Sequence, residues 1–122
     1  MSKSLAHVRH KALVHQSYRC YYCALPIGEQ DITSFRRQHS VSASQANLLR
    51  CTAEHLQPRS EGGCNAAFNI VAAHLWCNQN RHKARKPLDP SKFKNKVHLR
   101  MAKGKWWPRE ILTLLLKAEF GR

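Results

Sequence analysis

Four residues of the sequence have the types and the spacing of a zinc-binding site. Cys20 and Cys23 are separated by two residues, and His74 and Cys77 repeat this gap about fifty residues later. A two-residue gap lets both side chains of a pair reach one ion from a tight turn. Three thiolates and one imidazole form a closed tetrahedral set, so we expect Cys20, Cys23, His74 and Cys77 to bind a structural Zn²⁺. Such an ion would fasten the N-terminal segment to the segment around Cys77, in a chain too short for a large core.

The two other cysteines have no partner at ligand spacing. Cys51 lies in a predicted strand, where a small buried thiol is common, and Cys64 follows Gly63 in a predicted turn. Either could replace His74 in the zinc site, and two buried cysteines with an unrelated histidine remain the alternative to a site. The odd number of cysteines and an N-terminus unlike a secretory signal favour metal binding over disulfides. They also favour a reducing, cytoplasmic setting.

The charge of the chain indicates what kind of partner it binds. Lys and Arg number 21 against 7 Asp and Glu, which gives a formal net charge of +14 and a pI near 10.2. Such an imbalance favours a polyanionic partner, and nucleic acid is the commonest. The sequence has no apolar run of about 18 residues, so we expect no membrane-spanning segment.

The order of the motifs resembles that of the HNH endonucleases, which are metal-dependent nucleases built on a ββα-metal finger. The resemblance spans about half the chain and rests on Cys20-x-x-Cys23, Glu54-His55, Pro58, Ser60, Gly62-Gly63, Asn69-Ile70-Val71, Cys77-Asn78 and Lys83. The chain departs from the usual pattern in three ways. Glu54 stands where Asp is more frequent, His74 stands where a Cys is common, and the segment before Glu54 is longer than usual.

The resemblance implies a role for each polar residue of the motif. His55 would be the general base that activates water, because an imidazole titrates close to neutral pH. Glu54 and Asn78 would bind a catalytic Mg²⁺ or Mn²⁺, and Asn69 would orient the imidazole of His55. His82, four residues after Asn78 on the same helical face, could replace Asn78 as the ligand. The structural alternatives are a surface acid at Glu54, a structural histidine at His55, a strand cap at Asn69 and a helix cap at Asn78.

Neighbouring residues of a strand point to opposite faces. We therefore expect a strand end or bulge to turn either Glu54 or His55, so that both can reach one substrate.

The basic residues and the paired tryptophans are candidates for contact with the substrate. The residues expected to contact phosphates are Arg59, Arg81, Lys83, Arg85 and Lys86. Weaker candidates are Arg36, Arg37, Lys92, Lys94, Lys96, Arg100, Lys103 and Lys105. Trp106 and Trp107 either stack on bases or, more commonly, pack in the core.

We therefore expect an endonuclease that nicks or cleaves double-stranded DNA with low sequence specificity. RNA remains open as a substrate, and an inhibitor or a phage or host accessory protein is a possible partner. The alternative function is a non-catalytic zinc-containing DNA-binding module.

We expect an α+β fold to position these residues, namely a small ββα-metal finger held together by a structural zinc. We expect one domain over residues 1–122, with the finger at about 20–86. It is flanked by a helix over 5–18 and by a C-terminal basic segment and helix over 92–120. Residues 29–47 are polar and non-periodic, which predicts a long surface loop. The expected inner elements are a strand at 48–56, a second hairpin strand or the start of a helix at 69–75, and a helix at 77–86. Ile111, Leu112, Leu115 and Leu116 form an apolar stripe after Pro108 that is typical of a core helix.

Overall fold

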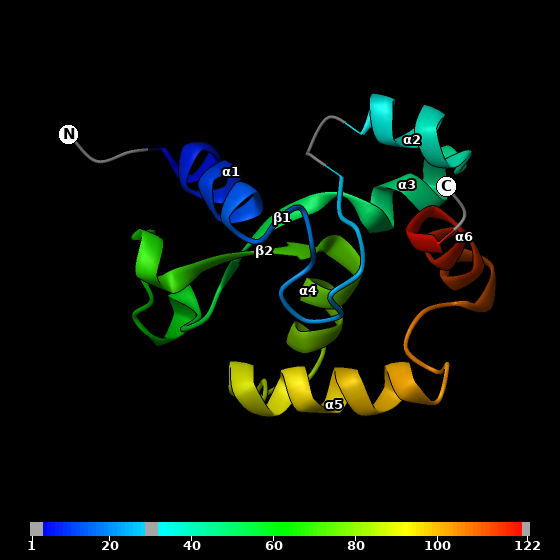
Figure 1. Ribbon diagram of the computed structural model, residues 1–122. Coiled ribbons are helices and arrows are strands. Elements are labelled where there is room, and N and C mark those ends of the chain that lie inside the picture. Colours follow the sequence, from blue (N-terminus) through cyan, green and yellow to red (C-terminus); the bar gives the residue numbers. More distant parts are fainter. Residues whose placement is uncertain (1–3, 29–31, 121–122) are drawn as a thin grey trace.

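The computed structural model describes residues 4–28 and 32–120, the side chains of residues 118–120 excepted. In these residues the chain has an α+β fold with one two-stranded antiparallel sheet and six α-helices. Figure 1 shows the short sheet between α1 on one side and the pair α4 and α5 on the other. The α-helices and strands, in chain order, are α1 (Leu5–His15), α2 (Thr33–His39), α3 (Ala43–Leu49), β1 (Cys51–His55), β2 (Ile70–His74), α4 (Leu75–His82), α5 (Pro90–Ala102) and α6 (Arg109–Phe120).

The hairpin of β1 and β2 lies at the centre of the molecule. The strands pair from Cys51 with His74 through to His55 with Ile70, so of the two alternatives expected for residues 69–75, a hairpin strand or the start of a helix, the structure has the strand. The first strand is shorter than the predicted 48–56, because Leu48 and Leu49 belong to α3. The side chain of Gln16 covers the outer edge of β2, since its amide nitrogen donates to the carbonyl oxygen of Ala72 and its amide oxygen accepts from the Ala72 N–H, both at 2.9 Å. This edge would otherwise present unpaired backbone groups to other chains.

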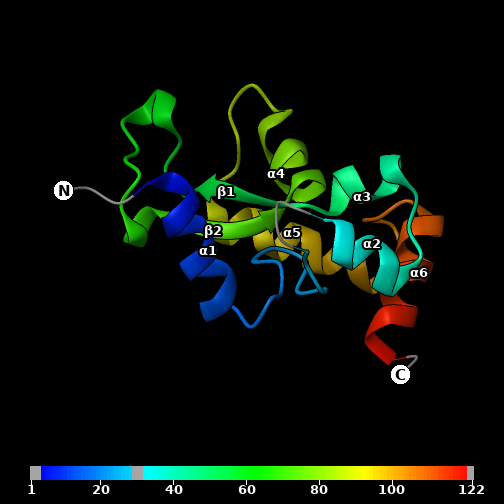
Figure 2. The same cartoon turned by 90° about the horizontal axis from the view of Figure 1, so that it is seen from above.

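The loop between the two strands extends beyond the body of the molecule. This hairpin loop (residues 56–69) carries two short 3₁₀ turns, Arg59–Glu61 and Ala67–Asn69. Figure 2 shows it at the end of the sheet opposite to α3 and α6. His55 is the last residue of β1, so it lies where the sheet ends and this loop begins.

Helix α1 is shorter than the predicted helix over 5–18. The hydroxyl of Ser4 accepts from the His7 N–H at 3.1 Å and caps its start. Ser17 and Tyr18 have φ angles of 56° and 58°, in the left-handed region where a helix cannot continue. Val8 and Leu13 are the buried residues of this helix, whereas His15 at its end is exposed.

The prediction of a long surface loop at 29–47 is wrong. Of this stretch, residues 29–31 lie outside the described part of the chain, and the remainder forms α2 and most of α3. A reciprocal capping box begins α3, with Ser42 and Gln45 each bonding the other's backbone N–H. Each helix has seven residues, about two turns, which is too short to show a helical period among polar side chains.

The C-terminal half is more helical than the sequence indicates. Helix α4 begins two residues before the predicted start at Cys77 and ends at His82, so Arg85 and Lys86 lie in the turn that follows it. The predicted basic segment forms helix α5, whose Asp89 cap accepts from the Lys92 N–H at 3.0 Å. No helix in the described ranges has the length and the apolar character that crossing a bilayer requires.

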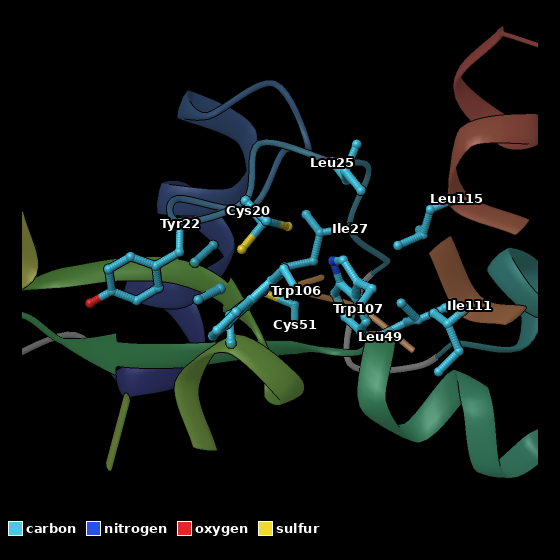
Figure 3. Packing of buried hydrophobic residues seen from close by; sticks show 14 of the residues in the cluster. Cys20, Tyr22, Leu25, Ile27, Leu49, Cys51, Trp106, Trp107, Ile111 and Leu115 are labelled. Atoms are coloured by element: carbon cyan, nitrogen blue, oxygen red, sulfur yellow. The ribbon is translucent and has the colours of Figure 1, made fainter. Parts of the chain in front are cut away.

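The paired tryptophans belong to the hydrophobic core, which is the commoner of the two roles expected for them. Trp106 and Trp107 are buried and pack in one cluster with side chains from the N-terminal segment, α3 and α6. Figure 3 shows this cluster, which includes Leu25, Ile27, Leu49, Ile111 and Leu115. The stripe of α6 faces the core through Ile111 and Leu115, while Leu116 is exposed.

Two adjacent leucines of α6 test this packing. Leu115 is 1% exposed and Leu116 is 39% exposed. We expect Leu115→Ala to lower the free energy of unfolding by about 2–5 kcal/mol, because it removes buried contacts and leaves a cavity. Leu116→Ala, the matched control, should cost less than about 1 kcal/mol. Urea denaturation followed by circular dichroism measures both, and equal losses would contradict this placement of α6.

Candidate functional site

The four predicted zinc ligands come together in one buried cluster. Cys20 and Cys23 lie in the turn after α1, which we call the knuckle (residues 19–26), His74 ends β2 and Cys77 lies in the first turn of α4. Their ligand atoms all lie within 4.8 Å of one another. Tetrahedral ligands about 2.3 Å from a Zn²⁺ ion are about 3.8 Å apart, so this spacing fits. The four residues can therefore hold a metal ion such as zinc.

The imidazole of His74 is oriented as a ligand should be. Its Nε2 lies 2.8 Å from the carbonyl oxygen of Pro26, and its Nδ1 lies 3.3 Å from Sγ of Cys23. A carbonyl oxygen only accepts, so Nε2 must carry a proton and Nδ1 faces the three sulfurs. A second partner that fixes the ring in this way is typical of metal-binding histidines.

The cluster of sulfurs favours a positive charge at its centre. Burial raises the pKa of Cys20, but hydrogen bonds with Cys23 and Cys77 outweigh it and hold the pKa well below the usual value. Burial lowers the pKa of His74, but the charges on Cys23 and Cys20 outweigh it and raise the pKa well above the usual value. A divalent cation satisfies the same demand when it displaces the protons.

Neither of the other two cysteines takes the place of His74. Cys51 is buried in β1, where it pairs with His74 across the sheet, and Cys64 is exposed in the hairpin loop. Among the described residues, the group that can hold an ion consists of the predicted four.

The carboxylate of Glu54 lies buried between β1 and α4. Its Oε2 accepts from the hydroxyl of Tyr22 at 3.0 Å and from Nη1 of Arg81 at 3.2 Å. Its Oε1 lies 3.0 Å from Nε2 of His82, whose side chain is 33% exposed. Burial and the neighbouring charge of Glu54 both raise the pKa of Tyr22, so its phenol stays protonated and donates. Glu54 is thus enclosed by three partners, of which His82 is the exposed one.

Arg81 is a structural residue, which argues against its predicted contact with phosphate. Its side chain is only 2% exposed. Beyond the ion pair with Glu54, its guanidinium donates to three carbonyl oxygens at 3.0 Å, those of His55, Leu56 and Leu88. Arg81 thus holds the end of β1 against α4 and the segment that follows it. A long run of basic residues does not reveal that one member is buried.

The imidazole of His55 faces the hairpin loop. Its Nε2 lies 2.8 Å from Oδ1 of Asn65 and 3.3 Å from Nε of Arg59, and Arg59 also donates to Oδ1 of Asn65 at 3.2 Å. The amide oxygen of Asn65 only accepts, so Nε2 of His55 carries a proton and donates to it. Nδ1 is therefore the ring nitrogen of neutral His55 that can take a proton. Sequence reasoning missed Asn65, which looks like an ordinary turn residue.

Glu54 and His55 keep the alternation of a regular strand. The pairing of β1 with β2 continues through Glu54 with Val71 and His55 with Ile70, so neither residue lies in a bulge. Of the two expected features, a strand end or a bulge, the structure has the strand end, because His55 is the last residue of β1. The two side chains have different surroundings, with Glu54 under α4 and His55 against the hairpin loop.

Asn69 fixes the hairpin loop and does not touch the imidazole directly. Its side chain accepts from the Gln57 N–H at 2.8 Å and donates to the carbonyl oxygens of Gln57 and Cys64 at 3.1 and 2.8 Å. Gly63 lies so close that a Cβ atom on it would be 1.7 Å from the carbonyl oxygen of Gln57. Asn69 and Gly63 thus stabilise the loop that carries Asn65, and Asn65 is the residue that contacts the imidazole of His55.

Glu54 contacts two residues of α4, Arg81 and His82, and Asn78 has a different partner. Asn78 donates through Nδ2 to the hydroxyl of Thr52 at 3.0 Å, and Thr52 donates to the carbonyl oxygen of Ala73 at 2.8 Å. Thr52 and Glu54 lie on the same face of β1, and Asn78 precedes His82 by about one helical turn. The structure thus favours His82, the alternative ligand, over Asn78 as the partner of Glu54.

Comparisons with protein-family models, with curated proteins and with solved structures return no match to this chain. Any inference about function therefore depends on the geometry and the charge of the site.

The cysteine cluster predicts that zinc and folding are coupled. We expect Cys77→Ser to lose the ion and to unfold, because the apparent binding energy of a structural zinc, about 10–16 kcal/mol, exceeds the stability of most small domains. Cys64→Ser, the control at an exposed thiol, should keep one zinc per chain and its fold. Elemental analysis and circular dichroism measure both properties. A folded Cys77→Ser protein without zinc would show that the cluster is not a structural metal site.

The buried ion pair makes a second prediction. Arg81→Met keeps much of the side-chain volume but leaves Glu54 charged and buried, so we expect a loss of about 3–5 kcal/mol in the free energy of unfolding. Arg85→Met, at an exposed position three residues after the end of α4, should change stability by less than about 0.5 kcal/mol. Chemical denaturation compares the two variants. A loss for Arg81→Met no larger than that of the control would mean that this ion pair does not hold β1 to α4.

Proposed function

We propose that this protein is an HNH-type endonuclease that hydrolyses phosphodiester bonds of DNA with a divalent metal ion, on a ββα-metal finger held by a structural zinc. One observation carries the proposal. At the end of β1, the imidazole of His55 lies against Asn65 and the exposed Arg59, and the preceding residue, Glu54, forms a carboxylate–imidazole pair with His82. An acid and a base thus stand at adjacent positions at one end of a strand, with an arginine beside the base, in a chain of net charge +14.

In this proposal His55 is the general base. Water becomes a nucleophile near neutral pH only when a base takes its proton, and His55 is partly exposed at the end of the sheet. The proton would pass to Nδ1, because Nε2 already carries a proton and donates to Oδ1 of Asn65 at 2.8 Å. Asn65 would hold the ring in place during this transfer, and the exposed guanidinium of Arg59 would be available to the negative phosphate.

The proposed site for the catalytic ion is formed by Glu54 and His82. Oε2 of Glu54 is already engaged by Tyr22 and Arg81, so Oε1 and Nε2 of His82 are the two donor atoms that suit an ion. A bound divalent ion would polarise the phosphate and stabilise charge on the leaving oxygen. A carboxylate beside an imidazole suits a transition metal ion such as Mn²⁺ better than Mg²⁺, which prefers oxygen ligands. Asn78 remains a candidate for a further oxygen ligand.

The exposed cations near this site support a nucleic-acid substrate. Lys83 follows His82 directly, and Arg85 and Lys86 lie in the turn after α4. All three are exposed, as is Arg59, so each can reach a phosphate without unfolding. Contacts of this kind bind the backbone without reading bases, which fits cleavage of double-stranded DNA with low sequence specificity.

A non-catalytic zinc-containing DNA-binding module is the second candidate, and one observation favours it. Oε2 of Glu54 is neutralised by the buried Arg81, and Glu54 and His55 have different surroundings on a regular strand. A carboxylate already paired with a buried cation binds a metal ion less well. In such a module Glu54 would serve only to hold α4 against β1.

A nicking assay separates the two functions. We expect supercoiled plasmid to be nicked with Mn²⁺, and to a smaller extent with Mg²⁺, but not without added divalent ion. His55→Ala should lower the rate at least about a hundredfold, since a positioned base contributes about 10²–10⁴. It should leave plasmid binding unchanged. His98→Ala, at an exposed position of α5, is the matched control.

Two results would overturn the nuclease proposal in favour of the binding module. One is tight plasmid binding without nicking under any divalent ion, in protein that contains zinc. The other is nicking by His55→Ala at the rate of His98→Ala, which would trace the activity to a contaminant or to another site.

A further inference from the structure

A cavity of about 510 Å³ lies between α4, α5 and the segment that joins α5 to α6. Its volume is within the range of about 300–1,000 Å³ that is typical of small-molecule sites. Trp76 and Asn80 line it from α4, and these residues are four apart, so they share one helical face. Arg81 and His82 contact Glu54 on β1, so α4 separates the two sites.

An indole held by its neighbours forms one wall of the cavity. Trp76 is partly buried and stacks on Trp107 with ring centroids 5.7 Å apart and an interplanar angle of 22°. Its Nε1 donates to the carbonyl oxygen of Trp106 at 3.2 Å. The ring is therefore fixed before any ligand binds, which lowers the entropic cost of stacking on it.

The other walls carry positive charge. Lys96, Arg100 and Lys105 line the cavity, and no acidic residue is among its lining residues in the described part of the chain. Arg100 donates through Nη2 to the carbonyl oxygen of Lys105 at 3.3 Å, which fixes one edge. The ammonium group of Lys83 lies 5.7 Å from the centroid of the Trp76 ring, at the side of α4 that leads to His82. Cations around an aromatic ring form a site for a flat, negatively charged ligand.

We propose that this cavity, the Trp76 pocket, binds one unpaired nucleotide of a DNA strand. The base would stack on Trp76, where it displaces the ammonium group of Lys83, and the phosphate would contact Lys96 and Lys105. A simple anion would not use the indole wall, and an apolar ligand would leave three cations desolvated without a partner. A nucleotide satisfies both features at once, because every base has an aromatic face and every link of the strand has a charge.

The pocket would give the protein a preference for unpaired DNA. A base inside a duplex is stacked on its neighbours and cannot enter a side pocket without being extruded. Helix α4 has a diameter of about 10–12 Å, so a strand that places one nucleotide in the pocket can pass Lys83 and bring a nearby phosphate towards His82. This inference shares with the proposed function only the assumption that the ligand is nucleic acid, and it requires no catalysis.

Binding measurements without added divalent ion test the pocket apart from cleavage. The probes are a fluorescein-labelled oligothymidylate of about twelve nucleotides and a blunt hairpin duplex with the same number of phosphates, at one fixed ionic strength. The pocket variant is Lys96→Ala with Lys105→Ala. The matched control, Lys92→Ala with Lys103→Ala, also removes two exposed charges from α5 and the segment after it, at positions that do not line the cavity.

We expect the pocket variant to bind the oligothymidylate at least about tenfold more weakly than the unsubstituted protein, and the control less than about threefold more weakly. Duplex binding should fall equally in the two variants. The oligothymidylate should also quench the tryptophan fluorescence of the unsubstituted protein more than the duplex does. Equal losses of oligothymidylate binding in both variants, or equal quenching by both probes, would overturn the proposal. Specific oligothymidylate binding in a protein that never nicks plasmid would refute the nuclease and leave the pocket standing.

Discussion

The fold depends on one buried cluster, in which three thiols and one imidazole surround a common centre. A two-stranded hairpin is marginal by itself in water, and a chain of this length has a modest core. The cluster joins the knuckle to the end of β2 and the start of α4. The C-terminal part is tied to it as well, since Trp106 donates to the sulfur of Cys77 at 3.3 Å and Trp107 packs edge-on against His74.

This anchor also sets the direction of α4, and with it both candidate sites. Helix α4 follows β2 without an intervening loop, so the fixed positions of His74 and Cys77 determine which way the helix runs. One face then meets β1, where Arg81 clamps the strand end and His82 meets Glu54. Another face presents Trp76 to the cavity beside α5. A single short helix thus takes part in the metal centre, the carboxylate pair and the aromatic pocket.

The features that could be predicted are those encoded by local spacing. The ligand set follows from two-residue gaps, the hairpin from two apolar stretches around a turn, and α6 from a leucine stripe after a proline. The errors have tertiary causes. Two short helices went unrecognised because two turns show no period, and the burial of Arg81 depends on a carboxylate 27 residues earlier. Asn65 could not be recognised because only the fold of the hairpin loop brings it to His55.

The hairpin loop is built differently from the rest of the chain. It is held by the amide of Asn69 and the close approach of Gly63, whereas the body is held by thiols and indoles. Phe68, near its end, is 81% exposed, so the loop has little hydrophobic support of its own. A substitution in the hairpin loop can therefore change the surroundings of the His55 imidazole while the contacts that hold the body of the molecule stay in place.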